Sequence, residues 1–298
     1  MQTETTSPTP RKARKARKAS QPRAEVLPTR RDIEFNLPAG KIKDWNGHGK
    51  HLSHFMNTLS ILFPVGERFF IKAVRNYRDQ ITDPELAKAV TAFIGQEAMH
   101  GREHEDYNDA VFAAIEDSEQ QERFVKWLLG TAQKITPDSF QLSATIALEH
   151  FTAIMADGLL REPRILEGSD PAFANVWTWH ALEETEHKAV AYDVWEQVMG
   201  KGVLAYSNRA GGLLVATPIL WSVVAYYYLR TLRKDGELTN ARGWKNFFKV
   251  SFGELGYFRK MAKPWADYFR PSFHPWDHDN RQFLKLLEDF PASVQQAS

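Results

Sequence analysis

Seven residues of this 298-residue chain have the types and spacing of metal ligands. Residues three or four positions apart share a face of an α-helix, so Glu97 and His100 can bind one ion together. The same geometry places His180, Glu184 and His187 on one helical face. With two further glutamates in apolar surroundings, the candidate ligands, which are also the candidate catalytic residues, are Glu67, Glu97, His100, Glu149, His180, Glu184 and His187.

Their charges suit a site for two divalent cations. Four carboxylates cancel the charge of two such ions, and neutral imidazoles complete the coordination, so the site can be buried at low electrostatic cost. Ferritin-like di-iron and di-manganese bundles take one glutamate from each of two helices and a Glu-x-x-His motif from each of the other two. The chain has these four parts, in the order Glu, Glu-x-x-His, Glu, Glu-x-x-His, and one additional histidine, His180. We therefore expect an all-α fold: a ferritin-like four-helix bundle with a di-metal centre and additional C-terminal helices.

Each assignment also has a plainer alternative. A single Glu-x-x-His motif on a helix is typical of a solvated, charged face. Glu67 could instead pair with Arg68 or Arg75, and His180 could be a core histidine bonded to a backbone carbonyl. Glu149, in contrast, lies in a stretch too apolar for a solvated face. The repetition of the whole pattern favours metal binding.

A second group of residues is placed to support the ligands. His104 and Tyr107 continue the helical stripe of Glu97 and His100, where packing is the alternative role. The carboxylates of Glu183 and Glu186 point away from the Glu184 face, so they either support the ligands or are solvated. Further candidates for hydrogen bonds to the ligating imidazoles are Asp157, Tyr192 and Asp193.

Apolar residues recur at helical spacing through most of the chain, and no stretch alternates with period two. Asp83-Pro84, Pro137-Asp138 and Asp170-Pro171 are typical helix starts. Three regions follow from this pattern: a disordered basic tail over 1–40, the di-metal bundle over 41–200, and a helical extension over 201–298 that packs on the bundle or contacts a membrane.

Composition limits the chemistry and the partners. The chain has no cysteine, which excludes disulfides and thiolate ligands, and its net charge is +1. Imidazoles and carboxylates then suit iron, with manganese and zinc as alternatives. Nucleic acid is not expected as a partner, although the basic run over 11–18 could touch it or an acidic lipid instead of serving as a solubilising arm. No secretory signal is recognisable, which indicates a cytoplasmic protein.

Residues 210–229 contain no charged side chain and are long enough to cross a bilayer. Two glycines, a proline, a threonine and a serine dilute the hydropathy of this stretch. A helix buried against the bundle or in a homodimer interface is the favoured interpretation, and membrane contact is the alternative. The aromatic and basic segment that follows either packs over the bundle or lies on a membrane surface.

The ligand pattern, including the third histidine, resembles that of the di-iron N-oxygenases of the p-aminobenzoate N-oxygenase type over residues 50–200. Phe63-Pro64-Val65-Gly66-Glu67-Arg68-Phe69-Phe70 and Gly95-Gln96-Glu97-Ala98-Met99-His100-Gly101-Arg102-Glu103-His104 are similar to a bacterial family called "predicted metal-dependent hydrolase". Resemblance to the N-oxygenases implies a ferritin-like bundle, iron, activation of dioxygen and oxidation of an amine.

These observations favour a di-iron, oxygen-dependent oxidase or oxygenase acting on a small organic substrate. Such an enzyme needs dioxygen and an electron donor as partners. The alternative enzyme is a di-metal hydrolase, in which the metal pair lowers the pKa of a bridging water. Storage or sensing of iron or manganese is a non-enzymatic alternative, although storage normally requires a cage of subunits.

Overall fold

The computed structural model describes residues 26–288 and residue 290. Within this part of the chain every regular element is helical, which confirms the predicted all-α fold. The α-helices are α1 Lys50–Arg75, α2 Pro84–Ala114, α3 Glu119–Ile135, α4 Asp138–Arg161, α5 Pro171–His187, α6 Val190–Met199, α7 Val203–Lys234, α8 Ala241–Ser251 and α9 Tyr257–Asp267. Short 3₁₀ turns lie at Ala39–Lys41, Arg78–Gln80, Pro163–Leu166, Pro275–Asp277 and Arg281–Lys285.

The predicted helix starts are confirmed, and capping explains two of them. The side chain of Asp83 accepts hydrogen bonds from the backbone N–H groups of Glu85 and Leu86, just before Pro84 begins α2. Asp170 caps α5 in the same way through the N–H of Ala172. Helix α4 begins at Asp138, directly after Pro137. These caps set where the two helices that carry Glu-x-x-His motifs begin.

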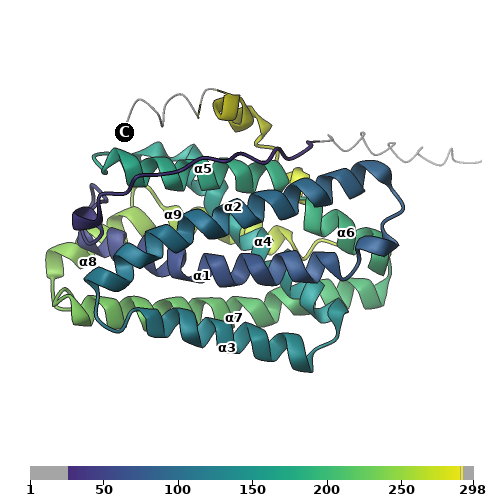
Figure 1. The fold of residues 1–298 in the computed structure, drawn as a ribbon, viewed down its shortest axis with the longest axis horizontal. Coiled ribbons are helices and arrows are strands. Elements are labelled where there is room, and N and C mark those ends of the chain that lie inside the picture. Colours follow the sequence, from purple (N-terminus) through teal and green to yellow (C-terminus); the bar gives the residue numbers. More distant parts are fainter. Residues whose placement is uncertain (1–25, 289, 291–298) are drawn as a thin grey trace, which may run out of the picture.

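Four long helices form the bundle (Figure 1). Helix α1 packs along α2, α4 packs along α5, and contacts between α1 and α4 and between α2 and α5 close the arrangement. Helices α3 and α7 cover one side, where α3 packs mainly on α1 and α7 mainly on α4. Helices α8 and α9 pack against α1 and α4, respectively. The C-terminal extension is therefore part of the same packed body as the bundle.

The N-terminal boundary differs from the predicted one. Residues 26–38 run as an extended segment across α2 and α5 (Figure 1). The side chain of Ile33 is buried, and the backbone N–H groups of Thr29 and Phe35 donate to carboxylates of α5 and α2. A dozen residues without helical periodicity gave no sequence signal for this packing. The basic run over 11–18 lies outside the described residues.

Helix α7 contains the charge-free stretch. Among the described residues, it is the one helix long and apolar enough to cross a membrane, with 28% of the apolar window buried. The side chain of Arg209, near its start, is buried and donates to the backbone carbonyls of Tyr268 and Arg270. Close packing also occurs at Gly212, where a Cβ atom would collide with Ser143 of α4. Helix α7 is therefore built into the protein along one face.

Candidate metal centre

The bundle brings all seven candidate ligands into its interior. Glu67 comes from α1, Glu97 and His100 from α2, and Glu149 from α4, while α5 supplies the other three. Each of the seven side chains belongs to a residue that is at most 5% exposed. Residues separated by as many as 120 positions therefore meet in one polar cluster, and the apolar remainder of the core surrounds it.

The ligand atoms form two groups. Atoms of Glu67, His100 and His180 lie within 4.8 Å of one another, and so do atoms of Glu97, Glu184 and His187. Glu184 also joins the groups, because its Oε1 lies 3.2 Å from His180 Nε2 and 3.5 Å from His187 Nε2. Each group could hold a metal ion, and the Glu184 carboxylate lies close to histidines of both groups.

The seventh candidate, Glu149, lies at the second group. Its Oε2 is 3.7 Å from His187 Nε2, although it is not a member of the tight set of three. Burial raises the pKa of Glu149 well above its usual value, and the charges of Glu97 and Glu184 raise it further. The pKa of Glu67 is raised well above its usual value for the same reasons. Burial and the neighbouring carboxylates thus outweigh the lowering effect of His187 on both pKa values.

The cluster also contains buried polar atoms without hydrogen bonds. Among the described residues, both carboxylate oxygens of Glu67, Glu97 and Glu149 have none. The Nε2 atoms of His180 and His187 have none either, although His187 Nε2 is 3.0 Å from Glu97 Oε1. A buried polar group without a partner costs about 1–3 kcal/mol, and an ionised one costs more. Cations at the centre of the cluster would satisfy these atoms together, so the donor set fits two metal ions.

A chain of hydrogen bonds determines which nitrogen His180 turns towards the cluster. Asn108 donates its amide to the carbonyl of Ser60, so its Oδ1 accepts from the Ser60 hydroxyl at 2.7 Å. Ser60 Oγ must then accept from His104 Nδ1, at 2.9 Å. His104 Nε2 is left as an acceptor for His180 Nδ1, at 2.8 Å. His180 therefore carries its proton on Nδ1 and presents the lone pair of Nε2 to the cluster.

A proline in α1, Pro64, leaves the backbone carbonyl of Ser60 free to accept the hydrogen bond from Asn108. Pro64 has no N–H to donate to the carbonyl of Ser60 one helical turn earlier. The amide of Asn108 from α2 satisfies that carbonyl instead, at 3.1 Å. The backbone hydrogen bond missing at Pro64 thus orients Asn108, which is the first residue of the hydrogen-bond chain that leads to His180.

A second chain fixes His187 in the same way. The amide nitrogen of Gln96 donates to Glu186 and to the carbonyl of Thr29, at 2.6 and 3.0 Å. Its Oε1 is therefore an acceptor for His187 Nδ1, at 3.0 Å. The ring is thereby oriented with Nε2 towards Glu97 and the rest of the cluster. Both α5 histidines are thus held with Nε2 directed at the cluster, as metal binding requires.

The third imidazole, His100, has carboxylates on both sides. Its Nδ1 lies 3.7 Å from Glu184 Oε1, and its Nε2 lies 3.2 Å from Glu183 Oε2. Arg31 donates to Glu183 and, with two nitrogens, to Glu186. Burial raises the pKa of Glu183 to about 7, against the lowering effect of Arg31. Glu183 and Glu186 are therefore buried and paired, and the solvated alternative is excluded for both.

Several contacts of the centre were missed from the sequence. Gln96 and Asn108 carry recognisable signals, since Gln96 adjoins Glu97 and Asn108 lies one turn after His104. Ser60 lies two turns before Glu67 on the same face of α1. Arg31 had no usable signal, because it lies in the segment that was assigned to the tail.

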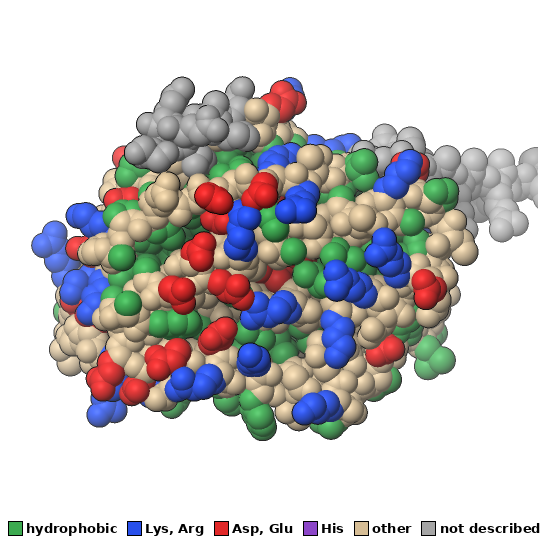
Figure 2. All heavy atoms as spheres, viewed as in Figure 1, with side chains coloured by type: hydrophobic (Ala, Val, Ile, Leu, Met, Phe, Trp, Pro, Cys, Tyr) green, Lys and Arg blue, Asp and Glu red, His purple; other side chains and the backbone are tan. Residues whose placement is uncertain are grey.

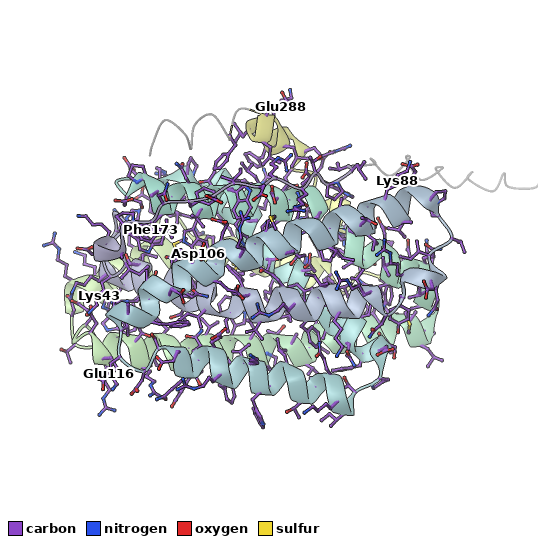
Figure 3. All side chains as sticks on the ribbon, in the orientation of Figure 1. Lys43, Lys88, Asp106, Glu116, Phe173 and Glu288 are labelled. Atoms are coloured by element: carbon purple, nitrogen blue, oxygen red, sulfur yellow. The ribbon has the colours of Figure 1, made fainter. Side chains whose placement is uncertain are left out.

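The structure places the predicted supporting residues differently. His104 contacts His180, as its position in the stripe predicts. Tyr107 lies one turn further along, donates to Asn57 at 2.6 Å and packs edge-on against Phe173, labelled in Figure 3. Asp157 accepts from Arg161 and Asn280, Tyr192 donates to the Phe273 carbonyl, and Asp193 contacts His274. Their predicted contacts with the ligating imidazoles stay a prediction. Tertiary packing at the C-terminal segment recruits these three side chains.

A small cavity of about 40 Å³ borders the cluster at His180 and Glu184. Its other walls are mainly apolar side chains of α1, α4, α5 and the C-terminal helices, Phe63 and Trp177 among them. The ring of Phe63 stacks on the His180 imidazole, with 4.6 Å between ring centroids. A small molecule in this cavity would contact ligand side chains in nearly dry surroundings.

Comparison with known proteins adds a family. A family model described as "predicted metal-dependent hydrolase" matches residues 29–279. The searches of curated proteins and of solved structures each found no match. The resemblance to the N-oxygenases therefore has no counterpart in these comparisons. Since the match spans the bundle, the ligand cluster and most of the C-terminal extension, the chain belongs to the predicted metal-dependent hydrolase family.

Proposed function

We propose that the seven-residue cluster binds two metal ions and that both ions are iron, with manganese and zinc as alternatives. The observation that carries this proposal is the set of buried carboxylate and imidazole atoms without hydrogen bonds. In the proposed site, Glu184 lies between the ions, one ion is bound by Glu67, His100 and His180, and the other by Glu97, Glu149 and His187. Hard oxygen and imidazole ligands suit these metals.

We further propose that the protein catalyses oxygen-dependent oxidation of a small organic substrate, with an amine as one candidate. Bound ferrous iron would supply electrons to dioxygen, and a separate electron donor would restore the ferrous state. The chain itself would hold the reacting group of the substrate in the cavity of about 40 Å³ beside His180 and Glu184. Phe63 and Trp177 would exclude water from it, which limits side reactions.

The cavity walls favour an apolar substrate over an anionic one. Besides His180 and Glu184, the side chains with polar atoms on these walls are Thr152, Ser251, Tyr257 and Trp177. No lysine or arginine lines this cavity in the described structure, so a phosphoryl or carboxylate group would find no cationic side chain. An apolar substrate matches the walls better.

Hydrolysis is the second candidate, and the family description favours it. Two metal ions at this spacing of ligands would lower the pKa of a water between them and polarise a carbonyl or phosphoryl oxygen. Such an enzyme would work without oxygen and with redox-inert zinc. These requirements are opposite to those of the oxidation chemistry, so one set of measurements separates the two candidates.

The test is stopped-flow absorbance after anaerobic, ferrous-loaded protein is mixed with oxygenated buffer, with iron per chain determined on the same sample. The proposal expects about two iron ions per chain and a transient visible band. Binding of two metals with no reaction with oxygen, even with candidate amines present, would reject oxidation. Anaerobic turnover of esters or phosphate esters by the zinc-loaded protein would then establish hydrolysis.

A further inference from the structure

Helix α7 presents an uncharged face to the outside. Residues 210–229 contain no charged side chain, and several large apolar residues in this stretch are at least 43% exposed: Leu214, Val215, Ile219, Tyr226 and Leu229. Large contiguous apolar surfaces on a protein mark places where another apolar body binds.

Beside this face, a second cavity enters the bundle. It has a volume of about 170 Å³ and is lined by α1, α3, α4 and α7. Its lining is aliphatic and aromatic apart from Thr136 and Thr152, and it includes the exposed Val215 and Ile219 of α7. A cavity of roughly 150 Å³ with such walls stays dry and binds benzene. This one therefore has room for a hydrocarbon segment.

The large cavity adjoins the small one at the metal centre. The two share the wall residues Leu59, Phe63, Thr152 and Met155. The side chain of Phe63 lines the large cavity, and its ring stacks on the imidazole of His180. A change in the rotamer of Phe63 would thus join the α3–α7 side of the molecule to the candidate ligands.

Helix α3, which borders the same cavity, has both basic and apolar side chains on its exposed surface. Its most exposed residues are basic or apolar, namely Arg123, Phe124, Lys126, Trp127, Lys134 and Ile135, and Arg123 pairs with Glu119 near the start of the helix. Figure 2 shows Lys and Arg side chains interspersed with hydrophobic ones over the region of α3, in the lower part of the view, together with some Asp and Glu side chains. Basic and aromatic side chains on one helix face are typical of helices that lie in the headgroup region of a bilayer.

From this juxtaposition we infer that the large cavity binds the hydrocarbon chain of a membrane lipid or of a lipid-derived substrate, which enters from an anionic bilayer on which the α3–α7 face docks. The inference rests on the proposed function, because it names the substrate class of that site. Docking leaves α7 on the surface of the membrane, since its other face is held by buried contacts of Arg209 and Gly212. A second copy of this chain fits the face less well, because an isologous contact would bring Arg123, Lys126 and Lys134 near their own copies.

Chain binding is tested by calorimetric titration of the whole protein with dodecanol, in metal-loaded and metal-free forms. Ala132→Phe adds a ring at the cavity wall formed by α3 and is expected to weaken binding at least about tenfold. Its control is Ala113→Phe, which adds the same ring at an exposed position of α2 and should leave binding unchanged. If Ala132→Phe does not fold, Val215→Trp narrows the cavity at a residue that is 43% exposed.

Docking is tested by sedimentation with vesicles of phosphatidylcholine, with and without an equal part of phosphatidylglycerol. We expect binding to the anionic vesicles that weakens as salt is added. Trp127→Glu and Ile219→Glu should each reduce it about tenfold, since each places a charge on the apolar face. Leu286→Glu, at a residue that is 52% exposed near the C-terminal 3₁₀ turn, should have no effect.

The outcomes separate this inference from the proposed function. Absence of dodecanol binding in both forms would overturn the inference even if two irons bind and react with oxygen. Dodecanol binding with no vesicle binding, or with dimers in light scattering that Ile219→Glu dissociates, would overturn the membrane route. Metal content and oxygen reactivity, measured on the same preparations, report on the proposed function alone.

Discussion

Helices α1 and α4 each face two regions of opposite character. On the α2–α5 side, Glu67 of α1 and Glu149 of α4 point into the ligand cluster. On the α3–α7 side, Leu62 of α1 and Leu148 of α4 line the apolar cavity. Leu148 and Glu149 are neighbours in the chain, and the turn of roughly 100° per residue sends them to different regions.

The two regions differ in how their side chains are packed and hydrogen-bonded. In the polar region, two hydrogen-bond chains orient His180 and His187, while carboxylates at the centre have no hydrogen bonds. Bound cations, as proposed, would satisfy these atoms. The apolar region has few polar atoms to satisfy and encloses a cavity of about 170 Å³. It is suited to accommodate a guest, and the predictions below test this division of labour.

The largest effect is expected from removing a ligand. His187→Ala and Glu97→Ala should each lose bound metal and all turnover, because each opens the coordination of an ion that several buried carboxylates share. Metal per chain and activity are measured together. Glu105→Ala is the control. Glu105 lies on α2 like Glu97, but its carboxylate is exposed and pairs with Arg68 of α1. Two tightly bound metals in His187→Ala would contradict the ligand assignment.

Metal removal should destabilise the folded protein strongly. A ligand present at a thousand times its dissociation constant stabilises the native state by about 4 kcal/mol. The free energy of unfolding, measured by urea denaturation, should therefore fall by about this amount for each ion removed by chelation and recover on reloading. Identical denaturation curves would mean that the buried carboxylates are satisfied without metal.

His104→Ala should weaken metal binding without abolishing it. The substitution removes the acceptor for His180 Nδ1, so the tautomer and ring orientation of His180 are no longer fixed. Loss of such a supporting contact typically costs about 10- to 100-fold in affinity, measured here by competition with a chelating dye. His48→Ala is the matched control, because His48 contacts the carbonyl of Arg164 far along the chain. Unchanged affinity in His104→Ala would reduce His104 to a packing residue.

The smallest effect is expected on the apolar side. Leu148→Ala should cost about 1 kcal/mol in the free energy of unfolding, because its side chain already borders empty space. Leu142→Ala on the same helix should cost about 3 kcal/mol, since Leu142 is fully buried and outside the cavity. Equal losses in Leu148→Ala and Leu142→Ala would show that the apolar region is packed as tightly as the rest of the core. The proposed binding of a hydrocarbon chain in the cavity would then lose its basis.

Much of the ligand set was predictable because its signal is local. Glu97 and His100 lie on one α2 face by spacing alone, and so do His180, Glu184 and His187 on α5. Spacing fails where support comes from elsewhere. Tyr107 continues the same stripe, yet its hydroxyl donates to Asn57 of α1.

The C-terminal side chains show the same limit. Asp193, near the ligands in the chain, instead contacts His274, which is 81 positions away. A contact of that kind leaves no periodic trace in the residues around it. Arg31 illustrates the converse, since it pairs with Glu183 and Glu186 from a segment whose composition resembles a tail.

The amino-acid sequence by itself determined the helical class, the starts of α2, α4 and α5 and the identity of the seven candidate ligands. All of these follow from helical periodicity and capping, which act over a few residues. Tertiary structure alone decided that Gln96 orients His187 and that the Ser60–Asn108 pair orients His180 through His104. It also decided that α7 leaves an apolar cavity beside α3. Both depend on the distance between surfaces of different helices, and no local pattern encodes that distance.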